Sequence, residues 1–329
     1  MHRRQFLTWQ ASLLAFPGLV NANTKANAAR WSVGPPLPRQ VQELYTAVHQ
    51  QKLYVAGGIG ARLGVPYFTN KVSAFDPAAQ VWRDVPDLPE DLHHVALVSN
   101  GTQLFGMGGF NGGYTHVWRM RDAVYELQND HWVKITTLPT PQAEGVVAHH
   151  KGLIHVVTGQ QPKGEANSER SDHTESHLHW VWDGSTWQDL APIPTARNSA
   201  TGGWIGDLLV VTGGRTASGN LADTEIYDKN TDTWRAAAPM PLPQAGTASV
   251  VVDDSLIVFG GEIFQPEASV FGNVWRYHVS RDQWEALPDM PNPRHGLGAG
   301  KIGDDIYVVG GATEPGGRGT SSLTEILTL

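Results

Sequence analysis

The 329-residue chain contains no cysteine. Disulfide bridges, thiolate metal ligands and cysteine nucleophiles are therefore excluded, and packing alone must hold the folded chain together. No segment approaches a run of about 18 apolar residues, the length that a membrane-spanning helix requires. Basic residues are scarce, with 24 Lys and Arg against 32 Asp and Glu. Because such an acidic chain repels phosphate backbones, nucleic acid is not expected as a partner.

The first residues have the pattern of an export signal. Arg3 and Arg4 precede a short apolar stretch over residues 11–20, and the pair resembles a bacterial twin-arginine signal, with an ordinary secretory signal as the alternative. Loss of this segment with its three basic residues changes the net charge from −8 to −11. We expect residues 1–28 to be a signal peptide and residues 29–329 to be one periplasmic or secreted domain, without membrane contact after signal removal.

Glycine, proline and tryptophan are abundant, with 36, 21 and 12 residues, and two of these residue types recur with one period. Five apolar runs end in Gly-Gly and a sixth ends in "VVTGQ", so that the first glycines are spaced by 51, 51, 54, 47 and 50 residues: Gly57, Gly108, Gly159, Gly213, Gly260 and Gly310. Six tryptophans are spaced by 51, 50, 55, 47 and 50 residues: Trp31, Trp82, Trp132, Trp187, Trp234 and Trp284. A shared period near 50 residues indicates a repeat architecture.

Each unit contains four short β-rich runs, as in "DKNTDTWRAAAPMPLPQAGTASVVVDDSLIVFGGE" and the run that follows it. Four short strands are the content of one blade of a β-propeller. The glycine pairs indicate close backbone approach, and the tryptophans supply large apolar surfaces to pack between blades. Gly, Pro and β-branched residues dominate every unit, which excludes a helical interpretation.

The glycine pairs, the spaced tryptophans and the aromatic residues of "AFDP", "EIYD" and "WRYH" resemble kelch repeats over residues 31–329, although the third copy departs from the pattern with Gly159-Gln160. The resemblance implies an all-β, six-bladed kelch propeller. In architecture and export the chain is also similar to the bacterial N-acetylneuraminate epimerases, which interconvert the anomers of sialic acid.

The last unit is one strand short, because only 18 residues without tryptophan follow Gly311. Trp31, in contrast, stands before the first glycine pair and belongs to no complete unit. We therefore expect the strand around Trp31 to be the fourth strand of the final blade. This pairing would close the ring and remove its free edges.

The propeller topology predicts where polar side chains converge. Residues about 14 positions before each glycine pair open the innermost strands, and are expected to surround the mouth of the axial channel. The candidates for acid–base catalysis there are Glu43, His94 and Glu144. The candidates for ligand binding at these positions are Arg197, Asn198, Gln244, Arg294 and His295. Arg215 and Glu262 are further candidates, because they directly follow their glycine pairs and can point inward. A structural ring of charges that neutralise one another is the alternative interpretation.

Long, Gly-rich loops follow the glycine pairs, and their length favours binding on that face over tolerated insertion. The longest loop contains His173, His177 and His179 beside acidic residues. A metal site is one interpretation of these histidines, but no clean ligand motif is present, and a solvated polar loop is favoured. No metal or cofactor is expected.

Three classes of function remain to be compared. The first is a carbohydrate or small acidic ligand bound at the channel mouth, with epimerase-like acid–base catalysis. The second is a non-catalytic module that binds a protein or peptide, for which Arg197, Ser199 and Arg294 suit an acidic ligand. The third, a copper radical oxidase of the galactose oxidase type, needs a tyrosine cross-linked to cysteine and is excluded. A closed pocket with a perturbed pKa would favour catalysis, and an open, normally titrating face would favour recognition.

Overall fold

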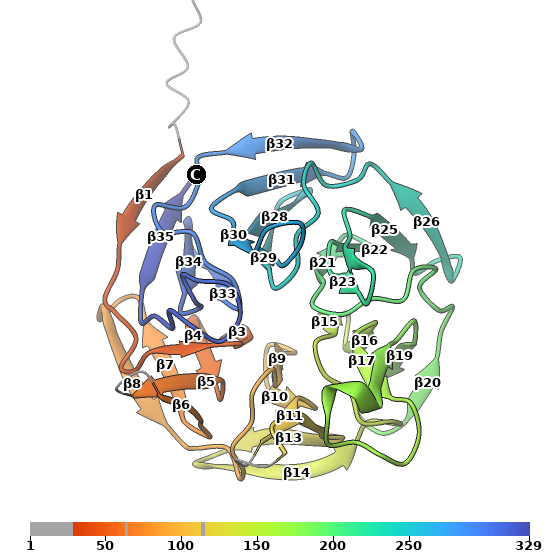
Figure 1. The fold of residues 1–329 in the computed structure, drawn as a ribbon, viewed down its shortest axis with the longest axis horizontal. Coiled ribbons are helices and arrows are strands. Elements are labelled where there is room, and N and C mark those ends of the chain that lie inside the picture. Colours follow the sequence, from red (N-terminus) through yellow and green to blue (C-terminus); the bar gives the residue numbers. More distant parts are fainter. Residues whose placement is uncertain (1–28, 63–64, 113–115) are drawn as a thin grey trace, which may run out of the picture.

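A computed structural model describes residues 29–62, 65–112 and 116–329, and the predicted signal peptide lies outside them. In this part of the chain, six antiparallel four-stranded sheets, here called blades, surround a central axis (Figure 1). The innermost strands of neighbouring blades contact one another around the complete ring. The prediction of an all-β propeller is therefore confirmed.

The first three blades each follow the chain outward from the axis. Blade 1 contains β3 (Thr46–His49), β4 (Lys52–Ala56), β7 (Val72–Asp76) and β8 (Val81–Val85). Blade 2 contains β9 (Ala96–Ser99), β10 (Leu104–Met107), β13 (Ala123–Gln128) and β14 (His131–Thr137). Blade 3 contains β15 (Val146–His150), β16 (Leu153–Val157), β19 (His179–Trp182) and β20 (Trp187–Asp189).

Blades 4 and 5 follow the same order, and blade 6 joins the two ends of the described chain. Blade 4 contains β21 (Thr201–Ile205), β22 (Leu208–Thr212), β25 (Thr224–Asp228) and β26 (Thr233–Ala237), and blade 5 contains β27 (Ala248–Val252), β28 (Ser255–Phe259), β31 (Val274–His278) and β32 (Gln283–Leu287). Blade 6 contains β33 (Gly298–Ile302), β34 (Asp305–Val309), β35 (Thr324–Thr328) and β1 (Arg30–Val33). Trp31 pairs with Leu327, which confirms the predicted closure.

Apolar side chains fill the spaces between blades, and each blade interface has its own buried cluster. The outermost strands add a recurring hydrogen bond from tryptophan. For example, the indole N–H of Trp82 donates to the carbonyl of Pro35 at 3.0 Å, and that of Trp31 donates to Pro288 at 2.9 Å. The Pro-rich links are thus attached to the rim of the next blade, which explains why proline and tryptophan recur together.

The glycine pairs lie where two blades come closest. A Cβ added to Gly57, whose φ is +64°, would be 2.2 Å from the carbonyl oxygen of Leu92 in the next blade. Gly58 then donates its N–H to the same carbonyl at 2.7 Å. A side chain at Gly57 would therefore push blades 1 and 2 apart.

The third repeat is aligned differently from the sequence prediction. Gly159 donates to the carbonyl of Arg197 at 2.8 Å, so it is the second residue of its pair, and Thr158 takes the first position with a φ of +56°. The Thr158 hydroxyl lies 2.6 Å from the Arg197 carbonyl oxygen and 2.9 Å from that of Ser176. Counted on the second residue of each pair, the spacings become 51, 50, 55, 47 and 50, the same as those of the tryptophans.

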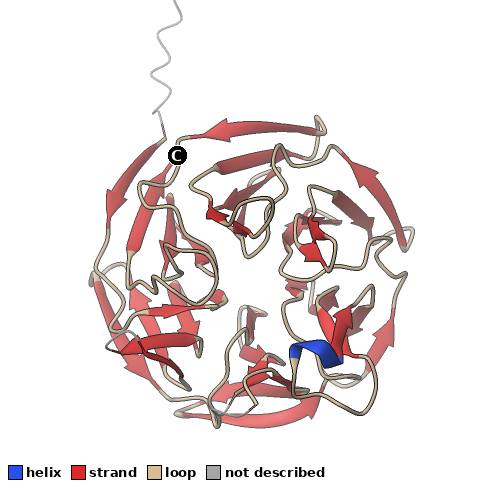
Figure 2. Ribbon diagram, in the orientation of Figure 1, coloured by secondary structure: helices blue, strands red, loops and turns tan. Residues whose placement is uncertain are grey.

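Short hairpins and one 3-10 turn lie over the blades on one face of the ring, here called the loop face (Figure 2). They are formed by β2 (Val41–Gln42), β5 (Ile59–Arg62), β6 (Val65–Phe68), β11 (Phe110–Asn111), β12 (Arg119–Met120), β17 (Gln160–Pro162), η1 (Arg170–Asp172), β18 (His173–Glu175), β23 (Arg215–Thr216), β24 (Gly219–Asn220), β29 (Glu262–Ile263) and β30 (Ser269–Val270). Within the described ranges, no helix is both long and apolar enough to cross a membrane.

Candidate functional site

Six equivalent residues, one before each innermost strand, form a ring at the mouth of the axial channel on the loop face. All six have a left-handed backbone, with φ values of +54°, +55°, +58°, +53°, +66° and +56°: Glu43, His94, Glu144, Ser199, Gly246 and Gly296. Hydrogen bonds connect several of these backbones across blades, for example from the N–H of His94 to the carbonyl of Glu43 at 3.0 Å. A left-handed conformation costs a residue with a side chain about 1–2 kcal/mol, so the four polar residues keep their places against local strain.

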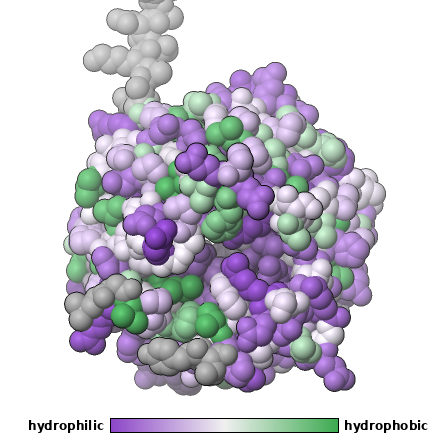
Figure 3. Space-filling view, viewed as in Figure 1, coloured by the Kyte–Doolittle hydropathy of each residue, from purple (hydrophilic) through white to green (hydrophobic). Residues whose placement is uncertain are grey.

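Side chains from all six blades are connected around this ring in a closed cycle, here called the mouth network. Its members are Glu43, His94, Glu144, Ser199, Arg215, Glu262 and His295. Starting from Glu43, the successive separations between polar atoms are 2.9, 3.5, 2.8, 3.2, 2.8, 3.5 and 3.6 Å, the last returning to Glu43. The space-filling view shows a hollow at this position with hydrophilic residues gathered around it (Figure 3).

Charges within the network stabilise one another. Burial on its own raises the pKa of Glu43, but the charge and hydrogen bond of His94 outweigh it and hold that pKa well below its usual range. Burial likewise lowers the pKa of Arg215, but the carboxylates of Glu144 and Glu262 outweigh this and raise it. Only the side chains of Glu43 and Arg215 are noticeably accessible, at 16% each. These two groups are therefore the ones that a ligand meets first.

The structure brings together seven of the ten residues predicted for the site. Glu43, His94 and Glu144, predicted as an acid–base group, are in direct contact, with His94 Nε2 between the two carboxylates. Arg215, Glu262 and His295 complete the network, and Asn198 is buried beside it with its side-chain oxygen 3.0 Å from Ser199 Oγ: these four were predicted for ligand binding.

Arg197, Gln244 and Arg294 do not face the channel, and the prediction that they line its mouth is wrong. All three are fully buried between strands. Arg197 forms an ion pair with Glu225, and Arg294 Nη1 lies 2.9 Å from Glu325 Oε2. The side-chain N–H of Gln244 donates to the carbonyl of Gly260 at 2.6 Å.

The cause of this error is an offset of two residues. Arg197, Gln244 and Arg294 each precede by two positions the ring residue of their blade, where the left-handed backbone reverses the chain. Their side chains therefore point into the blade, and the channel positions belong to Ser199 and two glycines. The predicted funnel of mixed charge thus becomes a mouth with three carboxylates and one arginine.

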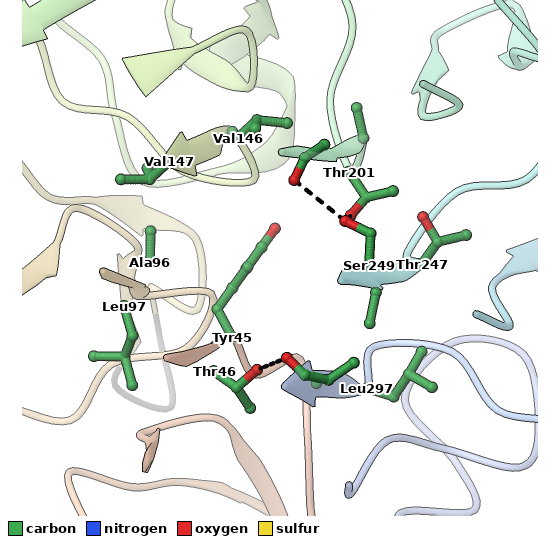
Figure 4. A pocket seen from close by; sticks show the side chains of 16 residues that line it. Tyr45, Thr46, Ala96, Leu97, Val146, Val147, Thr201, Thr247, Ser249 and Leu297 are labelled. Atoms are coloured by element: carbon green, nitrogen blue, oxygen red, sulfur yellow. Dashed lines mark hydrogen bonds between the residues drawn. The ribbon is translucent and has the colours of Figure 1, made fainter. Parts of the chain in front are cut away.

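Tyr45 also belongs to this region, although it was not among the residues predicted from the sequence. Its ring points into the axial channel just below the mouth (Figure 4), where the equivalent residues of the other blades are small: Ala96, Val146, Thr201, Ala248 and Gly298. The remaining cavity is about 110 Å³. Burial and the charges of Glu144 and Glu43 raise the pKa of the phenol, which keeps it neutral. A single aromatic residue among smaller ones at this equivalent position of the six repeats was the signal in the sequence.

A second pocket opens beside the mouth, between the β23–β24 hairpin and the residues after β29. It has a volume of about 170 Å³, and Arg215 is the charged residue among those that line it. The ring of Phe264, which is 44% exposed, forms one wall, and the guanidinium carbon of Arg215 is 5.3 Å from its centroid. The amide of Asn220 holds the two walls together by donating to the carbonyl of Glu262 at 2.6 Å.

The three histidines of the longest loop do not come together. His173 is buried with Nε2 3.2 Å from the side-chain oxygen of Asn167, His177 is exposed, and His179 is buried on β19 beside His155 at 2.9 Å. Among the described residues, no group of three His, Asp or Glu side chains is arranged to hold a metal ion.

Comparisons with known proteins agree with this architecture. A family model described as the KLHDC2/KLHL20/DRC7 Kelch-repeats domain matches residues 143–311, and a Kelch motif matches residues 46–89. The chain belongs to the kelch-repeat family. The prediction of kelch repeats from the glycine and tryptophan spacing is therefore confirmed.

Several kelch proteins of known sequence are similar to this chain. Kelch-like protein terF of Aspergillus terreus is 25% identical over 62% of this chain and 46% of its own length. Kelch-like protein 41b of Danio rerio is 27% identical over 61% of this chain and 30% of its own length, and a Kelch domain-containing protein of Sulfurisphaera tokodaii is 26% identical over 44% and 19%. The chain thus spans less than half the length of these relatives.

Proposed function

We propose that this kelch protein is a non-catalytic recognition module that binds a polypeptide segment of a partner protein at the loop-face mouth. Kelch repeats typically mediate protein interactions, which supports this class of function. The observation that carries the proposal is the mouth network, in which every charged group already has a partner within the protein. Such a mouth is a rigid, preorganised platform, and its strained ring residues are typical of a binding site.

The pocket beside the mouth supports a peptide ligand by its size. Small-molecule sites typically occupy roughly 300–1,000 Å³, whereas this pocket has about 170 Å³, the space of a single side chain. Exposed aromatic residues and fixed arginines are the residue types that dominate the energy of protein interfaces. Phe264 and Arg215 would therefore act as the anchor for one side chain of the partner.

Selection of peptides from a random display library on the immobilised protein tests this proposal. Peptides that bind the unmodified protein are expected to lose at least tenfold in affinity with Phe264→Ala, a typical effect for an interface anchor. Val33→Ala is the matched control, because Val33 is also exposed but lies on β1 at the rim. Peptides that bind the Phe264 variant as tightly as the unmodified protein would place recognition elsewhere.

A carbohydrate or small acidic ligand with epimerase-like catalysis is the second candidate, and it is favoured by the direct contact of Glu43, His94 and Glu144 and by the strongly lowered pKa of Glu43. Two features weigh against it. An acid catalyst must release a proton to the ligand, yet the Glu43 carboxyl stays ionised and the His94 ring is only 6% exposed. With Arg197 and Arg294 buried, the mouth also has an excess of carboxylates, which repel an acidic ligand.

Anomer exchange measured by NMR distinguishes the two candidates. For a recognition module, sialic acid and hexoses should exchange their anomers at the same rate with and without the protein. An acceleration that disappears in Glu43→Gln would establish the catalytic candidate and overturn the proposal. The same spectra with saturation transfer report whether any of these sugars binds.

We also propose that recognition takes place outside the cytoplasm, on the basis of the basic and apolar start of the chain. Mass spectrometry of the protein recovered from its producing cell is the test. A mature chain that begins near residue 29 is expected, and recovery of the protein with residues 1–28 intact would contradict export with cleavage.

A further inference from the structure

Two adjacent histidines at the mouth differ in surroundings and are hydrogen-bonded to each other. The ring of His93 is fully buried and stacks between Phe68 and Phe110, with centroid distances of 5.0 and 5.2 Å. Its Nε2 lies 2.7 Å from the carbonyl oxygen of Val117, and its Nδ1 lies 2.7 Å from Nδ1 of His94. A bond between two imidazole nitrogens needs one donor and one acceptor, so the remaining contacts decide which ring donates.

The carbonyl of Val117 can only accept, so Nε2 of His93 carries a proton. Burial, followed by the charge of His94, lowers the pKa of His93 to about 3, and the ring is neutral near pH 7. Its Nδ1 is therefore the acceptor, and His94 donates from Nδ1. On the other side, His94 Nε2 is 2.9 Å from Glu43 Oε2 and 3.5 Å from Glu144 Oε1, and carboxylates also only accept.

We infer that His94 is a doubly protonated imidazolium, buried between Glu43 and Glu144, and that it is the positioning residue that holds these two carboxylates together at the mouth. This inference deepens the proposed function, because it concerns the same binding site. Without the cation, two carboxylates would face each other in a region where water screens them poorly. The charged and titratable groups around His94 are His93, Glu43 and Glu144, with Arg170 and His173 beyond the aromatic rings of blade 2.

The longest loop, between β16 and β19, holds in place the segment with the Val117 carbonyl, which accepts the hydrogen bond from His93. The side-chain amide of Asn167, in blade 3, bonds to both the N–H and the carbonyl of Met120 in blade 2, at 3.1 and 2.9 Å. The guanidinium of Arg170 lies 4.1 Å from the centroid of the Trp118 ring. These contacts fix residues 117–120, including the carbonyl to which His93 donates. The loop therefore acts on the mouth through a chain of hydrogen bonds.

The charge of the mouth follows from this protonation. Glu43, Glu144 and Glu262 contribute three negative charges, and Arg215 and His94 contribute two positive charges. Without His295, these groups carry one net negative charge, and the accessible carboxylate is that of Glu43. The mouth therefore suits a partner segment that presents an ammonium or guanidinium group.

Long-range ¹H–¹⁵N NMR of the histidine side chains at pH 7.5 tests the inference on the unmodified protein, with N-acetylhistidine as the reference for a neutral ring. We expect a histidine signal with protons on both nitrogens, and this signal should disappear in His94→Asn. His93 should be neutral and protonated at Nε2 only. His93→Phe keeps the aromatic stack but removes the acceptor, and the Nδ1 proton of His94 is expected to be lost. If this variant does not fold, Glu43→Gln serves instead, and without its nearer carboxylate partner His94 should no longer carry protons on both nitrogens at pH 7.5.

An unprotonated nitrogen on His94 in the unmodified protein would overturn the inference, because the proton would then reside on Glu43 or His93. The spectrum requires no ligand, so that result would leave the peptide-binding proposal standing. A peptide selection that fails would, in turn, leave the protonation of His94 unaffected.

Discussion

Replacement of Arg294 provides the sharpest test of the architecture below the mouth. Its side chain and that of Glu325 are 0% and 1% exposed, and their charged atoms are 2.9 Å apart. Arg294→Met fills similar space but leaves the carboxylate buried without its cation, although Asn292 still donates to it at 2.7 Å. Breaking a buried pair in this way costs about 3–5 kcal/mol, and for a chain of this size the melting temperature should fall by roughly 6–15 °C.

Urea and thermal unfolding at pH 7.5, followed by tryptophan fluorescence, measure this effect. The double variant with Glu325→Leu removes both charges and is expected to recover most of the stability, since well-packed apolar pairs often replace buried ion pairs without loss. Arg276→Met is the matched control, because its pair with Glu285 is partly exposed and is worth about 1 kcal/mol or less.

An Arg294→Met variant whose free energy of unfolding at pH 7.5 lies within about 1 kcal/mol of that of the unmodified protein would contradict the expected loss. That result would mean that Arg294 is not buried in an ion pair, and the original prediction of an arginine at the channel mouth would regain its basis. Peptide binding adds a second readout: the variant, once folded, should bind selected peptides as the unmodified protein does.

Variants at three further positions test the repeat structure and its pH dependence by urea unfolding. Thr158→Gly relieves about 1–2 kcal/mol of left-handed strain but loses the hydrogen bonds of the hydroxyl, so the free energy of unfolding should hardly change. Thr158→Val keeps the strain and also loses these bonds, and should be less stable than the glycine variant by at least about 1 kcal/mol. Trp31→Ala should cost roughly 2 kcal/mol through loss of the bond to Pro288 and the edge contact with Phe259, and no loss would contradict closure by β1. Burial lowers the pKa of His155 from 6.5 to about 3, so between these pH values only the unfolded chain takes up this proton. As the pH falls from 6.5 to 3, this group should lower the free energy of unfolding by up to about 1.4 kcal/mol per pH unit. His155→Gln should make this slope shallower.

Part of the candidate site could be predicted because it follows from repeat position. Glu43, His94 and Glu144 open three innermost strands at equivalent places, and the same count along the chain locates each. Arg197 and Arg294 could not be placed in this way. Their carboxylate partners are 28 and 31 residues away in the chain, and the direction of each side chain depends on a left-handed residue two positions later.

The repeat period by itself determined the propeller and its closure by the strand around Trp31, because each blade must bury its faces against identical neighbours and tolerates no free edge. Only the tertiary structure decided which charged residues meet. Ion pairs and hydrogen bonds act over a few ångströms between side chains from different blades, and the spacing of residues along one strand carries no record of them. The mouth network, the burial of two arginines and the proton on His94 are therefore properties of the closed ring.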